Sequence, residues 1–290
     1  MAIRFKNEKC KVLHTNINNN PYNEYFLDGE ILKVCDQEKD LGVLTSDTLL
    51  WTDHINSSIS KANQLICWIT RNLISRDRNV LLPVYKTLIR PHLEYCVQLW
   101  NPAPEYGNWS LILRIEGVQR RFTRLIDGVG LLPYSERLEI LKLTTLIERR
   151  SRGDLIEVFK AKSGFSNVNG VFNFGRSGLN LISSLNSYSG TAKIRKLKRN
   201  FINECVVSYW NKLPIHVKNA YFIDNFKEEL EKFKVKSISN NIHDLDHFWG
   251  LTNEVITRIE GENYISNKDL HNDYLKLNPF VAKKKFINLN

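Results

Sequence analysis

The sequence predicts a mainly α fold: a helical bundle with a small N-terminal β-hairpin unit and a second helical C-terminal region. Three observations predict it. Strand-like alternation is confined to the first 50 residues, apolar residues then recur at helical intervals, and a Gly-, Ser- and Asn-rich segment interrupts the pattern before more helices follow. The expected units are the β unit at 1–50, a helical domain at 51–163, a linker at 164–192, a basic helical region at 193–248, and a tail of weak pattern at 249–290.

The N-terminal unit is predicted to be a β-hairpin. Residues 10–14 alternate like a strand, and two apolar pieces flank Asp28-Gly29, a dipeptide that favours a type I′ turn. Residues 41–43 (LGV) are expected to be a third short strand. Because so few strands are only marginally stable in water, we expect a partner sheet upstream.

The clearest helix is predicted to begin at Thr52, as its N-cap, and to bury one apolar face. That face consists of Ile55, Ile59, Ala62, Ile66, Ile69 and Leu73. Residues 77–90 are expected to continue helically, with Val80, Val84 and Leu88 on the core side and Pro83 early in the helix or bending it.

Residues 85–128 predict two helices of different character. The first has apolar bulk at Leu88, Leu93, Cys96 and Trp100, interrupted by Pro91. The second has Leu111, Ile115, Val118, Phe122 and Ile126 on one side, and Arg114, Arg120, Arg121 and Arg124 on the opposite side. This arginine face either contacts a polyanion or is only solvated.

Further helices are predicted to begin near Ser135 and at Leu146, the latter running to Lys162 with Arg149, Arg150 and Arg152 pointing outward. Two more are expected at 201–213 and 222–233. A basic run precedes them at 193–199 (KIRKLKR), with Lys193, Arg195, Lys196, Lys198 and Arg199. It could contact phosphates, act as an import signal or be a solvated charge run.

The composition narrows the class of protein. A formal net charge of +10 suits contact with nucleic acid but also plain solubility. The five cysteines form no C-x-x-C pair and are expected to be buried free thiols in a reducing compartment. With no signal peptide and no window of about 18 uncharged apolar residues, we expect an intracellular protein of the nucleus or cytoplasm without a membrane partner.

No catalytic motif is complete. The chain has no nucleotide-binding glycine loop and no nucleophile elbow. The one cluster with metal-ligand chemistry is His243, Asp244, Asp246 and His247, but no further ligand is evident, and a solvated cap or loop is the favoured interpretation. We therefore expect no metal or cofactor in this chain.

A series of segments in fixed order closely resembles the C-terminal part of reverse transcriptases of non-LTR, LINE-type retrotransposons of the jockey-like kind. The resemblance covers roughly residues 8–233. The segments are KCKVLH, EKDLGV, LLWTDHI, SKANQLI, YKTLIRPHLEYCVQLWNP, IEGVQRRFTRLI, YSERLEILKL, LIERRSRGDLIEVFK, YWNKLP and FKEEL.

The resemblance implies roles for particular regions. Lys9 is similar to the palm lysine that assists pyrophosphate departure in polymerases, and the hairpin before residue 43 is similar to the primer grip. The helices from Thr52 to Lys162 resemble the thumb and connection, which in this family hold an RNA template and DNA primer. The residues expected to contact nucleic acid are Arg114, Arg120, Arg121, Arg124, Arg149, Arg150, Lys193, Arg195, Lys196, Lys198 and Arg199.

The chain lacks the catalytic aspartates of the family that it resembles. Complete polymerases of this kind use Mg²⁺ held by paired palm aspartates, and no Asp-Asp dipeptide occurs in these 290 residues. We expect a C-terminal fragment that cannot polymerise DNA alone and needs a palm domain in cis or in trans. The alternative from another class is a helical protein-interaction module derived from a degenerate copy of such an element.

Overall fold

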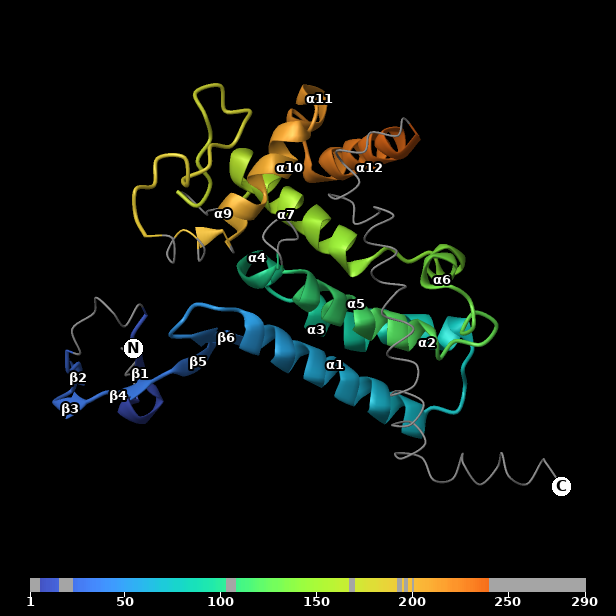
Figure 1. Ribbon diagram of the computed structural model, residues 1–290, viewed down its shortest axis with the longest axis horizontal. Coiled ribbons are helices and arrows are strands. Elements are labelled where there is room, and N and C mark those ends of the chain that lie inside the picture. The colour runs from blue at the N-terminus through green and yellow to red at the C-terminus, as the bar shows by residue number, and fades with distance from the viewer. Residues whose placement is uncertain are drawn as a thin grey trace, which may run out of the picture.

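The computed structural model describes residues 6–15, 23–102, 108–166, 170–191, 195, 198, 199 and 201–239, with side chains described as far as Lys234. Helices dominate this part of the chain and its strands are short, which confirms the mainly α fold with a small β unit. The β unit lies at one end of the helical body, next to the start of the long helix α1 (Figure 1).

The predicted N-terminal hairpin is present. Strands β2 (Phe26–Leu27) and β3 (Glu30–Ile31) pair antiparallel around Asp28 and Gly29, whose φ angles of 49° and 81° are those of a type I′ turn. After the short 3₁₀ helix η1 (Asn7–Lys9), strand β1 (Lys11–Leu13) pairs in parallel with β4 (Lys33–Cys35).

The third strand expected at 41–43 was wrong for Leu41 and Gly42, because a strand begins only at Val43. Strands β5 (Gln37–Asp40) and β6 (Val43–Ser46) form a second hairpin, and Leu41 and Gly42 are its turn, both with positive φ. This hairpin is tied to the helices, because the Leu44 N–H donates to His54 Nδ1 at 3.1 Å and Tyr95 Oη donates to the Leu41 carbonyl at 2.8 Å.

Helix α1 (Thr52–Asn72) buries the face that its periodicity predicted. Ile55, Ile59, Ala62, Ile66 and Ile69 are all buried, whereas Leu73 caps the C-terminal end and is partly buried. Thr52 is the first helical residue and not the N-cap, a position that Trp51 occupies. Helix α5 (Trp109–Thr123) lies against α1.

The face expected at 77–90 was wrong for two of its three residues, since only Val84 packs, partly buried, against the core. Val80 and Leu88 are exposed, and Leu81, Tyr85 and Ile89 are buried instead. The chain here consists of α2 (Arg78–Val84), a π-helical turn η2 (Tyr85–Ile89), α3 (Arg90–Glu94) and α4 (Val97–Trp100). The buried positions Leu81, Tyr85 and Ile89 recur every four residues through the π turn, so the buried face lies one residue later than expected from the start of α2 onward.

Helix α7 (Leu146–Lys162) follows α6 (Tyr134–Leu141) and belongs to two hydrophobic cores. Leu146 and Ile147 lie in the first core with α1 to α6, whereas Leu155, Val158 and Phe159 lie in the second. The second core is completed by α9 (Ile202–Cys205), α10 (Val207–Lys212), α11 (Ile215–Lys218) and α12 (Ile223–Ser239), which lie along one side of α7 in Figure 1.

Residues 170–191, which fall in the segment expected to be a linker, also contribute to the second core. Phe172 and Leu181 are buried there. The side chain of Asn211 fixes this segment, because its Oδ1 accepts from the Leu181 N–H at 2.8 Å and its Nδ2 donates to the Leu181 carbonyl at 2.9 Å. The neighbouring Trp210 Nε1 donates to the Leu179 carbonyl at 2.9 Å. The YWNKLP segment therefore anchors a long loop.

All five cysteines are free, as expected, but the expectation that they are buried was wrong for four of them. Only Cys205 is buried, and Cys67 is exposed on α1. No helix in the described part of the chain has the length and apolar character that crossing a membrane requires.

Candidate functional site

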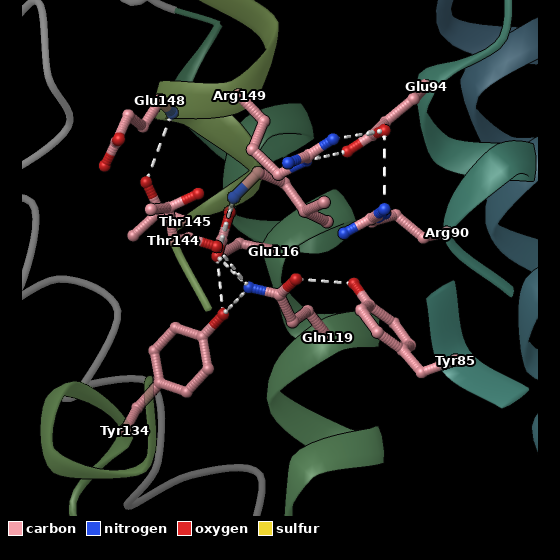
Figure 2. Close-up of polar contacts among 11 residues, drawn as sticks. Tyr85, Arg90, Glu94, Glu116, Gln119, Tyr134, Thr144, Thr145, Glu148 and Arg149 are labelled. Atoms are coloured by element: carbon pink, nitrogen blue, oxygen red, sulfur yellow. Dashed lines mark hydrogen bonds and ion pairs between the residues drawn. The ribbon is translucent and has the colours of Figure 1, made fainter. Parts of the chain in front are cut away.

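A buried polar network joins α5 to η2, α6 and the start of α7 (Figure 2). Gln119 lies at its centre: its Oε1 accepts from Tyr85 Oη at 2.5 Å, and its Nε2 donates to Tyr134 Oη at 2.8 Å and to the Thr144 carbonyl at 2.9 Å. Glu116 accepts from Tyr134 Oη at 2.6 Å and from the Leu146 N–H at 2.9 Å. The network connects η2, α5, α6 and the start of α7.

Burial is the largest influence on the pKa values of the ionisable groups in this network. Burial raises the pKa of Glu116, and the hydrogen bond from Tyr134 and the Arg150 charge oppose that rise. Burial also raises the pKa values of Tyr85 and Tyr134 well above the ordinary value for tyrosine. Both phenols therefore remain neutral donors. Because the network is enclosed and its groups satisfy one another, its role is to hold the helices in place.

A second set of polar contacts connects α7 with α3 and α4. Arg149 donates two hydrogen bonds to the Glu94 carboxylate, from Nε at 2.5 Å and from Nη2 at 3.1 Å. This pairing raises the pKa of Arg149. Arg150 Nε donates to Asn101 Oδ1 at 3.0 Å, and Asn101 Nδ2 donates to Asp154 Oδ2 at 2.7 Å. Both arginines thus stabilise contacts between helices.

These contacts correct the predicted arginine face. Arg120 is 8% exposed and Arg150 is 2% exposed, so neither can reach a polyanion in this fold. Arg124 is half-buried and burial lowers its pKa, with the neighbouring Arg120 charge adding to the effect. Arg149 is engaged by Glu94. The prediction failed because α6 and α7 cover a side of α5 that its apolar periodicity had marked as solvent-facing.

Arg114 and Arg121 are the exposed arginines of α5. They are seven residues apart and so lie on the same side of the helix, next to α1. Arg121 Nη1 donates to Asn63 Oδ1 of α1 at 2.9 Å. Arg114 lines an open groove of about 680 Å³ that runs along α1. The other lining residues are Asn56, Ile59, Ser60, Asn63, Gln64, Cys67, Trp68 and Arg71, all on α1.

The groove is lined without a carboxylate. Asp53 is the one acidic residue of α1, and it lies in the first turn, where it accepts from Gln37 at 2.8 Å. Glu116 is the one acidic residue of α5, and it is buried in the network on the other side of that helix. The positive charges of Arg71, Arg114 and Arg121 therefore meet no opposite charge from either helix, which favours an anionic ligand.

Sequence reasoning missed the α1 side of this groove. Its signal was present: beyond Asp53 the exposed face of α1 carries amides, hydroxyls, Trp68 and Arg71, with no acid among them. A solvated helix face normally mixes both signs of charge, so an acid-free face was the distinguishing feature.

The basic run lies partly outside the described residues, including Lys193 and Lys196. Of its described members, Arg195 Nη2 donates to the Tyr188 carbonyl at 2.6 Å, and the Lys198 ammonium lies 4.2 Å from the centre of the Tyr188 ring. Arg199 is half-buried. Arg195 and Lys198 thus converge on one tyrosine and do not extend the α1–α5 groove.

Lys9 is exposed at the end of η1 and not within a strand. The residues His243 to His247 lie outside the described residues. Within the described ranges, no three or more His, Cys, Asp and Glu side chains gather where they could hold a metal ion. The described residues thus offer no carboxylate cluster for the Mg²⁺ that the resemblance would imply, and we assign no step to such an ion.

Two helices present arginine, amide and indole groups along one open groove, groups that can bind and orient a ligand, and the buried network holds one of these helices, α5, in place. Comparisons with protein families, with curated proteins and with solved structures found no match for this chain.

Proposed function

We propose that this chain binds nucleic acid, specifically RNA and DNA in template-primer form, as the thumb and connection part of an RNA-directed DNA polymerase of the non-LTR retrotransposon kind. The observation that carries the proposal is the carboxylate-free groove along α1 and α5, with Arg71 and Arg114 in its wall and Arg121 beside it. The net charge of +10 adds a field of the right sign.

The proposal places no polymerisation in this chain on its own. The 290 residues contain no Asp-Asp dipeptide that could clamp two catalytic ions. A palm bearing those aspartates, in cis or in trans, is the partner that the proposed role requires, and the proposed location is intracellular, in the nucleus or cytoplasm.

The test is binding to a labelled RNA/DNA hybrid, measured by fluorescence anisotropy over a range of salt concentrations. If Arg114 and Arg121 each contact a phosphate, the double variant Arg114→Gln/Arg121→Gln should reduce the slope of log affinity against log salt by about 2. The matched control is Arg176→Gln/Lys142→Gln, which removes two exposed charges that do not line the groove. Affinity without salt dependence, or equal loss in both double variants, would contradict the proposal.

A second candidate function is protein interaction through the β unit. Tyr25, Phe26, Ile31 and Val34 are exposed large apolar side chains within a few residues of one another in the chain. Such a concentration favours an interface. If this function holds, the chain self-associates in sedimentation experiments, and Phe26→Ser/Ile31→Ser abolishes the association. A chain that stays monomeric at all concentrations would contradict this second function, and nucleic-acid binding would be the one remaining proposal.

A further inference from the structure

Trp68 is the least expected side chain of the groove. It is 60% exposed, on a helix whose opposite face is fully occupied with the core. Indole has one of the largest apolar surfaces of any side chain, and its flat face is the best platform for stacking against another ring. Arg71 lies one turn further along α1, and both side chains line the same groove as Arg114.

The groups around Trp68 match the parts of a nucleotide. Guanidinium groups bind phosphate in a fixed, forked geometry; Arg71 supplies one beside Trp68, and Arg114 supplies another from α5 further back along the groove. The amide side chains of Asn63 and Gln64 lie one turn before Trp68 and carry both donors and acceptors, as the edges of bases do. Phosphate, base face and base edge each find a counterpart within one groove.

A paired duplex cannot use such a platform along its length. Bases in a double helix are already stacked on their neighbours, so only an unpaired base has a face to offer to an indole ring. We infer that the Trp68 end of the groove takes a single-stranded part of the nucleic acid, with an unpaired base stacked on Trp68 and the neighbouring phosphate on Arg71, while Arg114, further back along α1, contacts a phosphate of another nucleotide. This inference rests on the proposed nucleic-acid function and adds the state of the strand that enters the groove.

The test compares three proteins, all as the full chain: the unaltered protein, Trp68→Ala and Trp68→Phe. The probes are a labelled 20-nucleotide oligo(dT) and a blunt 20-base-pair RNA/DNA hybrid, each measured by fluorescence anisotropy. Loss of one stacked base should weaken oligo(dT) binding about tenfold in Trp68→Ala, and Trp68→Phe should recover most of the loss because a ring is restored. Hybrid binding should change by less than about twofold in either variant, since paired bases do not stack on the ring.

Direct contact has a second readout. Oligo(dT) should quench part of the tryptophan emission of the unaltered protein, and that part should vanish in Trp68→Phe. The exposed-aromatic control is Tyr221→Ala, between α11 and α12 and outside the groove lining, which should match the unaltered protein in every measurement. Because Trp68 is largely exposed, equal thermal midpoints are expected for all variants.

The outcomes separate this inference from the proposed function. Unchanged oligo(dT) affinity and quenching in the Trp68 variants would overturn the inference, while a weakened Arg114→Gln/Arg121→Gln variant would still support nucleic-acid binding. Equal losses for oligo(dT) and hybrid in Trp68→Ala would also overturn it, because the site would then not distinguish unpaired bases. Failure of the unaltered protein to bind either probe would overturn both.

Discussion

Asp154 is a carboxyl group whose surroundings oppose its charge. It is 5% exposed, and its Oδ1 has no hydrogen-bond partner among the described residues. Burial raises its pKa to about 7, although the Asn101 hydrogen bond and the Arg150 charge act in the opposite direction. Between the ordinary carboxyl pKa near 4 and this raised value, the folded protein retains a proton that the unfolded chain releases. Its contribution to stability is therefore present at low pH and is lost as pH rises towards 7.

The variant Asp154→Asn should remove this pH dependence, because an amide stays neutral and can still accept from Asn101. Relative to the unaltered protein, the variant should gain stability as pH rises from 4 to 8, by at most about 4 kcal/mol for a shift of three pKa units. Urea unfolding at several pH values measures the gain. The exposed Asp127→Asn is the control, and parallel curves for Asp154→Asn and the unaltered protein would contradict the assignment.

Gln119 gives a prediction that does not involve pH. The variant Gln119→Leu removes the acceptor of the buried Tyr85 Oη and the donor to the partly buried Thr144 carbonyl, leaving both groups without this partner. The free energy of unfolding should fall by about 1–3 kcal/mol. Combining it with Tyr85→Phe should recover part of the loss, because the unpaired hydroxyl disappears. A loss no larger than that of the exposed Gln64→Leu would show that the network contributes little.

At the scale of elements, α1 and α7 were predictable and α5 only in part. The bounds of α7 match the prediction, and the buried face of α1 follows its apolar spacing because one side packs on a hydrophobic core. Helix α5 has a second buried side whose contacts are polar: Glu116, Gln119 and Thr123 are buried there along with Arg120. Apolar periodicity cannot reveal a polar interface. The spacing therefore predicts solvent-facing arginines on a side of α5 that is in fact buried. In α2 the buried face begins at Leu81, one residue after the expected Val80.

The hairpin of β5 and β6 contains a correctable local strain. Leu41 has a φ of 44° in the turn, a conformation that a branched apolar residue adopts poorly and asparagine adopts well. Because Leu41 is 83% exposed, Leu41→Asn loses little buried surface and should raise the free energy of unfolding by about 0.5–1 kcal/mol. Leu131, which is fully exposed, lacks the positive φ, so Leu131→Asn should give no such gain in thermal unfolding. Equal effects at both sites would contradict the strain argument.

At the scale of the whole molecule, the two hydrophobic cores are centred on different rings. Tyr85 stacks on Phe122 at 5.1 Å between centroids in the first core, and Phe159 stacks on Phe226 at 4.4 Å in the second. Glu148 and Lys234 form an ion pair between α7 and α12, and Arg152 binds Glu231 at 2.9 Å nearby. The sequence indicated two helical regions, but it could not show that α7 takes part in both, because its apolar residues look alike along the helix.

If the cores unfold separately, Phe226→Ala should increase amide hydrogen exchange in α9 to α12 and leave α1 to α5 protected. The reciprocal variant Phe122→Ala should do the reverse. Each truncation should cost about 3–5 kcal/mol in its own core. Exchange that rises uniformly across the chain in both variants would show instead that the molecule unfolds as one cooperative unit.

The sharing of α7 also fixes what lengths of chain this fold can tolerate. One residue added within a helix rotates everything after it by about 100°, since a turn contains 3.6 residues. An insertion between Ile147 and Leu155 would therefore turn Leu155, Val158 and Phe159 out of the second core while Leu146 stayed in the first. Helix α7 therefore fixes the rotation of the second core relative to the first. Insertions and deletions should be tolerated in the loops around α7 and not within it.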